Sequence, residues 1–292
     1  MLKKLVCLAE NTSRGACAAV HGLSLYVETG RHRLLFDMGP DETAFENAER
    51  LGIDLRLVDT AVISHGHNDH GGGLRRFLEL NPSAPVYLRP GAFEKHESRG
   101  PHGKNDIGLD PELKRHPRLR FVENAFSPDP ELTFFTAPER GLWPSSANDV
   151  LLENGVKDPF THETHLLVRG ALPGGDLLLT GCGHSGIANI LRALPAPPAL
   201  CVGGFHLYRP RTGETVPEST LRGLAGELKA CPGTVFYTCH CTGEHAFSVL
   251  SALLPGRIKS LTCGDTLLPE DLSGPEKEPD ALDAPGGARL QY

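Results

Sequence analysis

The sequence predicts an α/β fold in which helices cover the faces of β-sheets. Two observations indicate this. Compact runs of apolar and β-branched residues, typical of strands buried on both faces, recur along the chain. Between them, apolar residues fall at the three- and four-residue spacing of one helix face. With 292 residues the chain can bury a large core, as one α/β domain or as two smaller ones.

Strands come first and then alternate with helices. The basic N-terminus has an apolar stretch that Glu10 interrupts, so it predicts a first strand rather than a signal peptide. A helix is expected to start after Asp41 and to stop at Gly52, with Thr43 and Glu46 at capping-box spacing. Buried strands are predicted at residues 60–64, 177–180, 199–202 and 234–238, and helices around residues 74–78, 187–194 and 221–228.

Two segments lack this regularity. Residues 91–159 carry many Pro, Gly, His and charged residues and are too long for a simple connection, so we expect an irregular insert that covers or borders the active site. Residues 269–292 are rich in Pro, Gly and acids, and we expect a mobile tail there. The remaining residues, 1–268, are expected to form a single domain around the insert.

Composition excludes several functions. The net charge is −7 and no block of Lys or Arg stands out, which disfavours a nucleic-acid partner. No apolar run approaches the roughly 20 residues that cross a bilayer, so no membrane association is expected. The eight cysteines are scattered without a CxxC pair, which favours a reduced, cytoplasmic protein.

Four of the predicted strands run into a histidine. In open α/β sheets, ligands gather beyond the carboxyl ends of the strands. Imidazoles delivered to that edge from separate strands can therefore converge on one point. The histidines at these strand ends are His65, His184, His206 and His240.

The densest cluster of candidate ligands follows the strand at residues 60–64. In an extended segment His65, His67 and Asp69 would share one side, with His70 turned toward a neighbouring pocket. A single histidine is usually an ordinary surface residue, but three histidines and an aspartate within six positions are hard to explain by packing. Imidazole and carboxylate suit zinc best, and iron or manganese also accept them.

The segment HGHNDHGGGL at residues 65–74 resembles the HxHxDH signature of the metallo-beta-lactamase superfamily, and LLFDMG at residues 34–39 resembles its upstream strand and turn. The resemblance implies a four-layer αββα sandwich with a metal pair at one edge. Further segments resemble a subgroup that includes the dihydropterin–aminobenzene ribosyl-phosphate synthases; they are residues 10–11, 21–24, 181–186, 203–207 and 240–243.

This resemblance also implies roles for individual residues. One ion would be held by His65, His67 and His184, and a second by Asp69, His70 and His240. Asp37 would orient a ligand histidine through its other ring nitrogen. Glu10, Asn11 and His21 would lie near the pocket, although turn and cap roles explain them equally well.

One departure from the superfamily concerns the ligand between the ions. The family usually places a bridging aspartate at the strand end that here reads Gly-Gly-Phe-His206. A neutral imidazole offers one lone pair and cannot bridge, so His206 would bind one metal or the substrate. Cys182, Cys239 and Cys241 flank ligand histidines, and we interpret them as small residues packed under the site. His162, Glu163 and His165 form a further polar cluster that could contact the substrate.

The expected function is hydrolysis of a small-molecule ester, phosphoester or amide, with one or two Zn²⁺ ions as cofactor. Bound metal lowers the pKa of water from 15.7 to about 7. Our hypothesis is that Asp69 binds metal, orients the attacking water and takes up its proton. Three alternatives stay open: a synthase that joins a pterin to an aminobenzene ribosyl-phosphate, an iron-dependent oxidoreductase of the same fold, and a non-enzymatic binding module.

Overall fold

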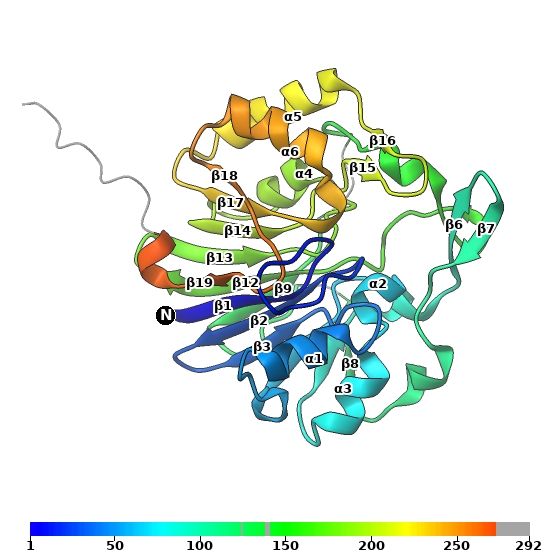
Figure 1. Cartoon of the computed structure of the whole chain (residues 1–292), viewed down its shortest axis with the longest axis vertical. Coiled ribbons are helices and arrows are strands. Elements are labelled where there is room, and N and C mark those ends of the chain that lie inside the picture. Colours follow the sequence, from blue (N-terminus) through cyan, green and yellow to red (C-terminus); the bar gives the residue numbers. More distant parts are fainter. Residues whose placement is uncertain (124, 138–140, 273–292) are drawn as a thin grey trace, which may run out of the picture.

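The computed structural model describes residues 1–123, 125–137 and 141–272, and two β-sheets lie face to face in it (Figure 1). The seven-stranded sheet has, in spatial order, β19 (Thr266–Leu267), β1 (Leu2–Ala9), β2 (Ser24–Thr29), β3 (Arg33–Phe36), β4 (Thr60–Val62), β5 (Val86–Leu88) and β8 (Leu119–Phe121). The six-stranded sheet has β18 (Ile258–Ser260), β17 (Val235–Thr238), β14 (Leu200–Gly203), β13 (Gly175–Leu179), β12 (His165–Leu172) and β9 (Leu132–Phe135).

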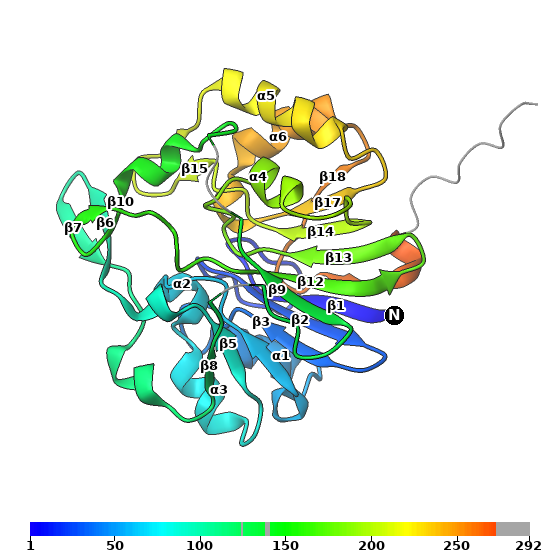
Figure 2. The ribbon, with the colours of Figure 1, turned by 180° about the vertical axis from the view of Figure 1, so that it is seen from behind.

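Helices cover the outer face of each sheet (Figures 1 and 2). The seven-stranded sheet carries α1 (Thr43–Arg50) and α3 (Leu74–Leu80), and the six-stranded sheet carries α4 (Ile187–Arg192), α5 (Glu218–Lys229) and α6 (Glu244–Leu253). Three apolar clusters fill the interfaces between these layers. Phe45 and Phe77 pack under α1 and α3, Phe36 and Phe134 pack between the sheets, and Phe236 packs under the second helix layer. The predicted four-layer αββα sandwich is confirmed.

The strands that place the site are those that the apolar runs predict. β4, β13, β14 and β17 fall within or next to the expected residues, and β13, β14 and β17 are parallel neighbours. Their carboxyl ends therefore meet at one edge of the sheet. The expected capping box of α1 is wrong, because Glu42 is the N-cap and makes no side-chain cap bond. The Asp41 carboxylate accepts the N–H of Thr43 instead, at 2.9 Å.

The segment 91–159 is more ordered than its composition suggests. It supplies β8 and β9 to the two main sheets and forms a separate four-stranded sheet. That sheet consists of β11 (Val156–Lys157), β10 (Leu151–Glu153), β6 (His96–Gly100) and β7 (Gly103–Asp106). These strands are short, and β6 and β7 consist of polar residues and glycine, so they lack the apolar alternation that marks a strand in a sequence. The small sheet projects at the edge where the strand ends meet (Figure 2).

Short elements complete the described chain. A two-stranded ribbon is formed by β15 (Tyr208–Arg209) and β16 (Glu214–Thr215). The 3-10 helices are η1 (Leu55–Leu57), η2 (Pro90–Phe93), η3 (Pro111–Arg115), η4 (Ser146–Val150), η5 (His240–Thr242) and η6 (Pro269–Leu272). Most of the predicted tail, residues 273–292, lies outside the described residues. Within the described ranges, no helix combines the length and the apolar character needed to span a membrane.

Candidate metal centre

The chain that follows β4 changes conformation within the HxHxDH segment. His67 is still extended, but Asn68–Gly71 form a short helix, α2. The helix begins because the His67 carbonyl accepts the N–H groups of His70 and Gly71, at 3.1 and 3.0 Å. The expectation that Asp69 continues one extended face with His65 and His67 is therefore wrong. Asp69 lies in the first turn of α2 and faces a different group of histidines.

The imidazoles of His65, His67 and His184 lie together. The ring centroid of His65 is 4.6 Å from that of His67 and 4.9 Å from that of His184, and the His67 and His184 centroids are 5.0 Å apart. All three side chains are buried. Burial lowers the pKa of each imidazole well below its ordinary value, and the neighbouring imidazoles add to the effect. The structure thus brings together the three residues expected to hold one ion, as neutral rings.

Asp69, His70 and His240 form the adjacent group. Asp69 Oδ2 is 3.2 Å from His240 Nε2 and 3.9 Å from His70 Nε2, and the two Nε2 atoms are 3.3 Å apart. Burial opposes ionisation of Asp69, but the imidazoles of His70 and His240 outweigh it and hold its pKa well below the usual range. The carboxylate is therefore charged, and it is the most exposed member of this group.

Four of these histidines share one arrangement of hydrogen bonds. The Nδ1 atoms of His65, His70, His184 and His240 lie 2.7 to 2.9 Å from oxygen atoms of Ser64, Asp37, Asn148 and Asn11 respectively. Each oxygen can accept the Nδ1 proton, which leaves a lone pair on Nε2. The Nε2 atoms of His65 and His184 are buried without a partner in the described chain. Such nitrogens are what a metal ion would satisfy, so the donor set fits an ion.

Asp37 connects both groups. Its Oδ2 accepts from His70 Nδ1 at 2.7 Å and from Ser64 Oγ at 2.8 Å, while Oδ1 accepts the Ser64 N–H at 2.7 Å. Ser64 Oγ in turn faces His65 Nδ1 at 2.8 Å. One buried carboxylate thus orients a ligand histidine of each group. Its position agrees with the expected role, and it adds His65 through the Ser64 hydroxyl.

The N-terminal residues hold the His240 loop. Glu10 Oε1 accepts the His240 N–H at 2.7 Å, and Asn11 contacts both the ring and the carbonyl of His240. Glu10 is buried and Asn11 is exposed, and both line a cavity of about 560 Å³ that also borders His240, so their contacts favour support of this histidine. His21 is exposed, and its Nε2 lies 3.6 Å from Asp69 Oδ2 at the cleft.

Glu163 and Asn148 hold the His184 loop in the same way. Glu163 accepts the N–H groups of His184 and Ser185 at 2.7 and 2.8 Å, and Asn148 donates to the His184 carbonyl. His162, Glu163 and His165 are all buried, at 0 to 2% exposure. None of the three lines the cleft, and His162 and Glu163 hydrogen-bond to other site residues, so the arrangement favours support of the site over contact with substrate.

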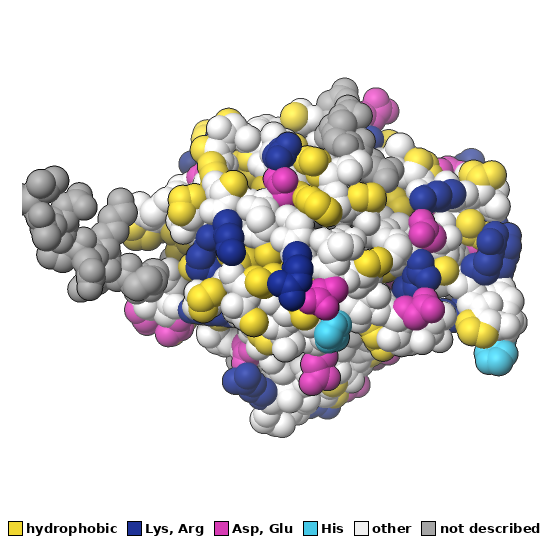
Figure 3. All heavy atoms as spheres, turned by 90° about the horizontal axis from the view of Figure 1, so that it is seen from above, with side chains coloured by type: hydrophobic (Ala, Val, Ile, Leu, Met, Phe, Trp, Pro, Cys, Tyr) yellow, Lys and Arg dark blue, Asp and Glu magenta, His cyan; other side chains and the backbone are white. Residues whose placement is uncertain are grey.

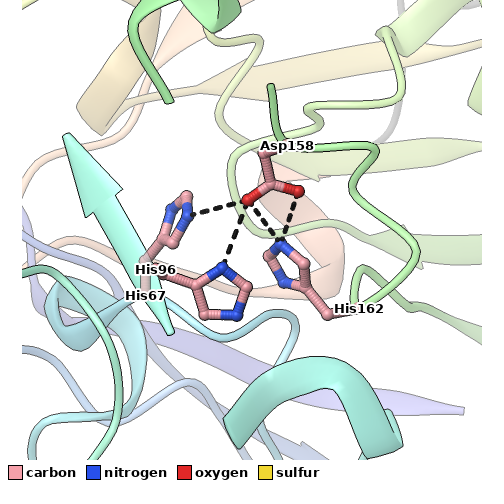
Figure 4. Close-up of side chains that lie close together, drawn as sticks. All are labelled: His67, His96, Asp158 and His162. Carbon is pink, nitrogen blue, oxygen red and sulfur yellow. Dashed lines mark hydrogen bonds and ion pairs between the residues drawn. The ribbon is translucent and has the colours of Figure 1, made fainter. Parts of the chain in front are cut away.

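His67 lies next to residues of the segment 91–159. Figure 4 shows the imidazoles of His67, His96 and His162 grouped around the Asp158 carboxylate. Asp158 Oδ2 is 3.2 Å from His96 Nδ1, 3.1 Å from His162 Nε2 and 4.0 Å from His67 Nε2. His67 Nε2 therefore faces the Asp158 carboxylate, at the long distance of 4.0 Å. His96 and Asp158 have no motif around them, which is why the sequence did not reveal them.

Comparison with known proteins places this geometry in a family. The sequence model of the metallo-beta-lactamase superfamily matches residues 18–184, more than half of the chain. This chain belongs to the metallo-beta-lactamase superfamily. A crystal structure of Tm1679, described as a metal-dependent hydrolase of this superfamily, is 29% identical with a TM-score of 0.75, and the match covers 91% of this chain and 98% of that one.

Two relatives come from Methanocaldococcus jannaschii. An uncharacterized protein is 28% identical over 84% of this chain and 93% of its own length. A 7,8-dihydropterin-6-methyl-4-(beta-D-ribofuranosyl)-aminobenzene-5'-phosphate synthase is 28% identical over 77% of this chain and 82% of its own length. Members of the metallo-beta-lactamase superfamily bind metal ions, and this chain contains groups of His and Asp residues that could hold such ions.

In this member of the superfamily the centre opens into a cleft of about 340 Å³. His67, Asp69, Cys182, His206 and His240 line its inner part. Its outer part is lined by Ser98, Asn105 and Leu151 from the small sheet and by Arg211 from the turn between β15 and β16. The segment 91–159 therefore borders the site, as its position in the sequence suggested.

His206 differs from the other strand-end histidines. Both of its ring nitrogens are buried without a partner in the described chain, and its backbone is left-handed, with φ of 46°. Asp37 and His240 are also left-handed, with φ of 58° and 52°. Such backbone is unusual for residues other than glycine and clusters at functional sites. The His206 ring centroid is 4.2 Å from that of His184, so His206 stands beside the first histidine group.

Asp158→Asn is expected to weaken metal binding about tenfold and to lower the free energy of unfolding by about 1–3 kcal/mol. Hydrogen bonds from His162 and His96 outweigh burial and lower the pKa of Asp158, so the native cluster contains a carboxylate that an amide cannot replace. Metal competition with a chelator and thermal unfolding measure the two effects. Glu153→Gln, a nearby half-buried acid, is the control. Reduced stability with unchanged metal affinity would show that Asp158 supports packing but not His67.

Metal affinity is expected to rise between pH 7 and 9 as His70 loses its proton. Burial lowers the pKa of His70, but the Asp37 and Asp69 carboxylates outweigh it and raise that pKa to about 9. Below this value a proton occupies the nitrogen that an ion needs, so binding must release it; above it His70 no longer adds to the pH dependence. The affinity should therefore gain up to about tenfold per pH unit between pH 7 and 9. Chelator competition at several pH values tests this, and a flat profile contradicts it.

Proposed function

We propose that this chain is a metal-dependent hydrolase that uses a two-ion centre on a small-molecule ester, phosphoester or amide. One observation carries the proposal. Two adjacent groups of histidines, with the partly exposed Asp69 beside them, lie at a cleft that opens to solvent and offer enough donors for two ions. A binding module would need no such cleft, whereas a hydrolase needs room for water and substrate beside the ions. Zinc is the preferred cofactor, and iron or manganese would suit the same nitrogen and oxygen donors.

The chemistry divides between the ions and the side chains of the cleft. Bound ions would lower the pKa of water and polarise the oxygen under attack. Asp69, which is ionised and 20% exposed, accepts a hydrogen bond from the attacking water and so orients it, and it takes up the proton released in the attack. His206 offers a free ring nitrogen to the substrate or to one ion. The side chains of the cleft thus orient the attacking water and the substrate and accept the proton.

A small anionic substrate suits the rim of the cleft. Arg211 lies there, and its guanidinium is within 3.0 Å of the side-chain oxygen of Asn105 when that amide is oriented to accept. Its contact there is with a neutral amide, so the guanidinium charge is available to a phosphate or carboxylate. Basic and acidic side chains are interspersed on the face seen in Figure 3, which supports a small molecule rather than nucleic acid as partner.

A synthase is the second candidate function. The relative that carries a synthase name acts, by that name, on a dihydropterin and an aminobenzene ribosyl-phosphate. The Arg211 rim would suit the phosphate of such an acceptor. Incubation with a dihydropterin and an aminobenzene ribosyl-phosphate, followed by mass spectrometry of the products, separates the two. A joined product supports the synthase, and cleavage of simple esters or phosphodiesters without it supports the hydrolase.

The direct test combines elemental analysis with a substrate screen. Protein purified without added metal is expected to contain up to two ions per chain and to hydrolyse members of an ester, phosphodiester and lactone panel. His67→Ala should lose an ion and activity together. His102→Ala, an exposed histidine outside the cleft, is the control and should match the wild type. Absence of bound metal would overturn the proposal, while iron with redox activity and no hydrolysis would favour the oxidoreductase alternative.

We also propose a reducing, cytoplasmic location. All eight cysteines are buried and free in the described chain. Free thiols at a metal centre persist where the compartment keeps them reduced. Localisation of the tagged protein by cell fractionation tests this.

A further inference from the structure

Cys182 lies between the two groups of ligands. Its sulfur and the nitrogens of His65 and His184 lie within 4.8 Å of one another, and so do its sulfur and the nitrogens of His70 and His240. Cys182 Sγ is 3.1 Å from His70 Nε2, and the side chain is 2% exposed. Among the described residues, no other side chain is named in both of these ligand groups.

The distances around Cys182 match those of a metal site. Zinc bonds to nitrogen and sulfur are about 2.0 and 2.3 Å long, so ligand atoms at the corners of a tetrahedron are separated by about 3.3 to 3.6 Å. Two of the separations on one side of Cys182 are close to this range, and the third lies within 4.8 Å. His70 Nε2 is 3.1 Å from Cys182 Sγ and 3.3 Å from His240 Nε2.

The sequence around Cys182 explains how its side chain enters the centre. A Cβ on Gly181 would lie 2.1 Å from Ser64 Oγ, so only glycine lets the end of β13 approach the Asp37–Ser64 pair. Gly183 has a left-handed φ of +67°, which turns the chain between Cys182 and His184. The side chains of Cys182 and His184, which follow β13 and are two residues apart, can then both point toward the candidate metal centre.

His206, by contrast, does not lie between the groups. Its ring forms a group with Cys182 and Cys241 and lies beside that of His184, with the two ring planes inclined at 54°, so its ring contact is with the first histidine group. A neutral imidazole also has one free lone pair. A thiolate has several lone pairs, so one sulfur can bind two ions. The residue placed to bridge two ions is therefore Cys182, whereas the sequence comparison pointed to His206 at the strand end where the family has an aspartate.

We propose that the Cys182 thiolate is a shared ligand of the two metal ions. This inference rests on the two-ion centre of the proposed function. On binding, the thiol releases its proton to solvent, and sulfur lone pairs form one bond to each ion. No oxidant or reductant takes part. Cys182 is thereby a ligand rather than a small residue packed under the site, and it replaces the bridging aspartate usual in the superfamily.

Cobalt substitution tests the inference without measuring activity. Co²⁺ bound to a thiolate gives an intense near-ultraviolet charge-transfer absorption, which nitrogen and oxygen ligands do not give. We expect this band in the Co²⁺-loaded wild type and its loss in Cys182→Ser. The second equivalent of Co²⁺ should bind at least tenfold more weakly in Cys182→Ser. Cys182→Asp should regain the second equivalent, because a carboxylate can bridge, but should not regain the band.

Two matched variants identify the sulfur. Cys239→Ser changes a buried thiol next to His240 that belongs to the apolar cluster between the sheets, and it should keep the band. Cys241→Ser changes a buried thiol near His206, and it should also keep the band. Loss of the band in Cys241→Ser together with its retention in Cys182→Ser would overturn the proposal.

X-ray absorption of the wild-type zinc protein gives a measurement that needs no variant to fold. A sulfur scatterer at about 2.3 Å supports the thiolate, and a first shell of nitrogen and oxygen alone overturns it. The outcomes also separate this inference from the proposed function. Two bound ions with no sulfur ligand leave the hydrolase intact and refute Cys182, whereas absence of bound metal refutes the two-ion centre itself.

Discussion

Asp69→Ala is expected to lower kcat by about 10³-fold while the ion held by His65, His67 and His184 stays bound. Asp69 Oδ2 is close to His240 Nε2 and His21 Nε2, and its carboxylate lines the cleft, where water and substrate must meet. Loss of this oxygen removes the acceptor that orients the attacking water. The histidine group that holds the first ion does not include Asp69, so that ion should remain.

Steady-state kinetics and elemental analysis on the same preparations measure the two quantities. Glu79→Ala, which removes an exposed acid on α3, is the control and should leave both unchanged. The informative comparison is between turnover and metal content. If ions and activity disappear in equal proportion, Asp69 is only a ligand; if turnover collapses while one or more ions remain, it also acts on water. Unchanged turnover would remove Asp69 from the mechanism.

The sequence predicts the layers of this fold well because they rest on local patterns. The runs that became β4, β13, β14 and β17 are buried on both faces, so nearly every residue in them is apolar. β6, β7, β10 and β11 could not be predicted in this way. They form a small sheet at the edge of the molecule, and β7 and β11 are exposed throughout. Without a buried face, a strand has no alternation to show.

In the site, too, the residues that follow a local sequence pattern were predictable and the others were not. The ligand histidines are predictable because several lie within one short segment or directly after an apolar strand. Among the oxygens that orient them, the family resemblance indicated that of Asp37. Those of Asn148 and Asp158 could not be predicted, since these residues come from the insert and reach His184 and His67 only after the chain has folded. Cys182 illustrates the limit most clearly. From its neighbours in the sequence it is interpreted as a small residue packed under the site. The three-dimensional arrangement places its sulfur between two groups of imidazoles.

Asp37→Ala is expected to destabilise the protein by about 3–5 kcal/mol and to weaken metal binding by about 10- to 100-fold. Asp37 is 0% exposed and accepts hydrogen bonds from the Ser64 N–H, the Ser64 hydroxyl and His70 Nδ1. Removal leaves three buried donors without a partner, and no water can reach them easily. The same change frees the rings of His70 and His65, so the nitrogens that face the ions lose their fixed orientation.

Chemical unfolding of the metal-free protein isolates the stability term, and chelator competition isolates the affinity term. Asp37→Asn is the matched variant: its amide oxygen can still accept the Ser64 N–H, so it should recover part of the stability. It carries no charge, however, so it should lower the pKa of His70 from about 9 and flatten the dependence of metal affinity on pH between 7 and 9. Full metal affinity in Asp37→Ala would show that packing alone orients His70, because the hydrogen bond at 2.7 Å would then be dispensable.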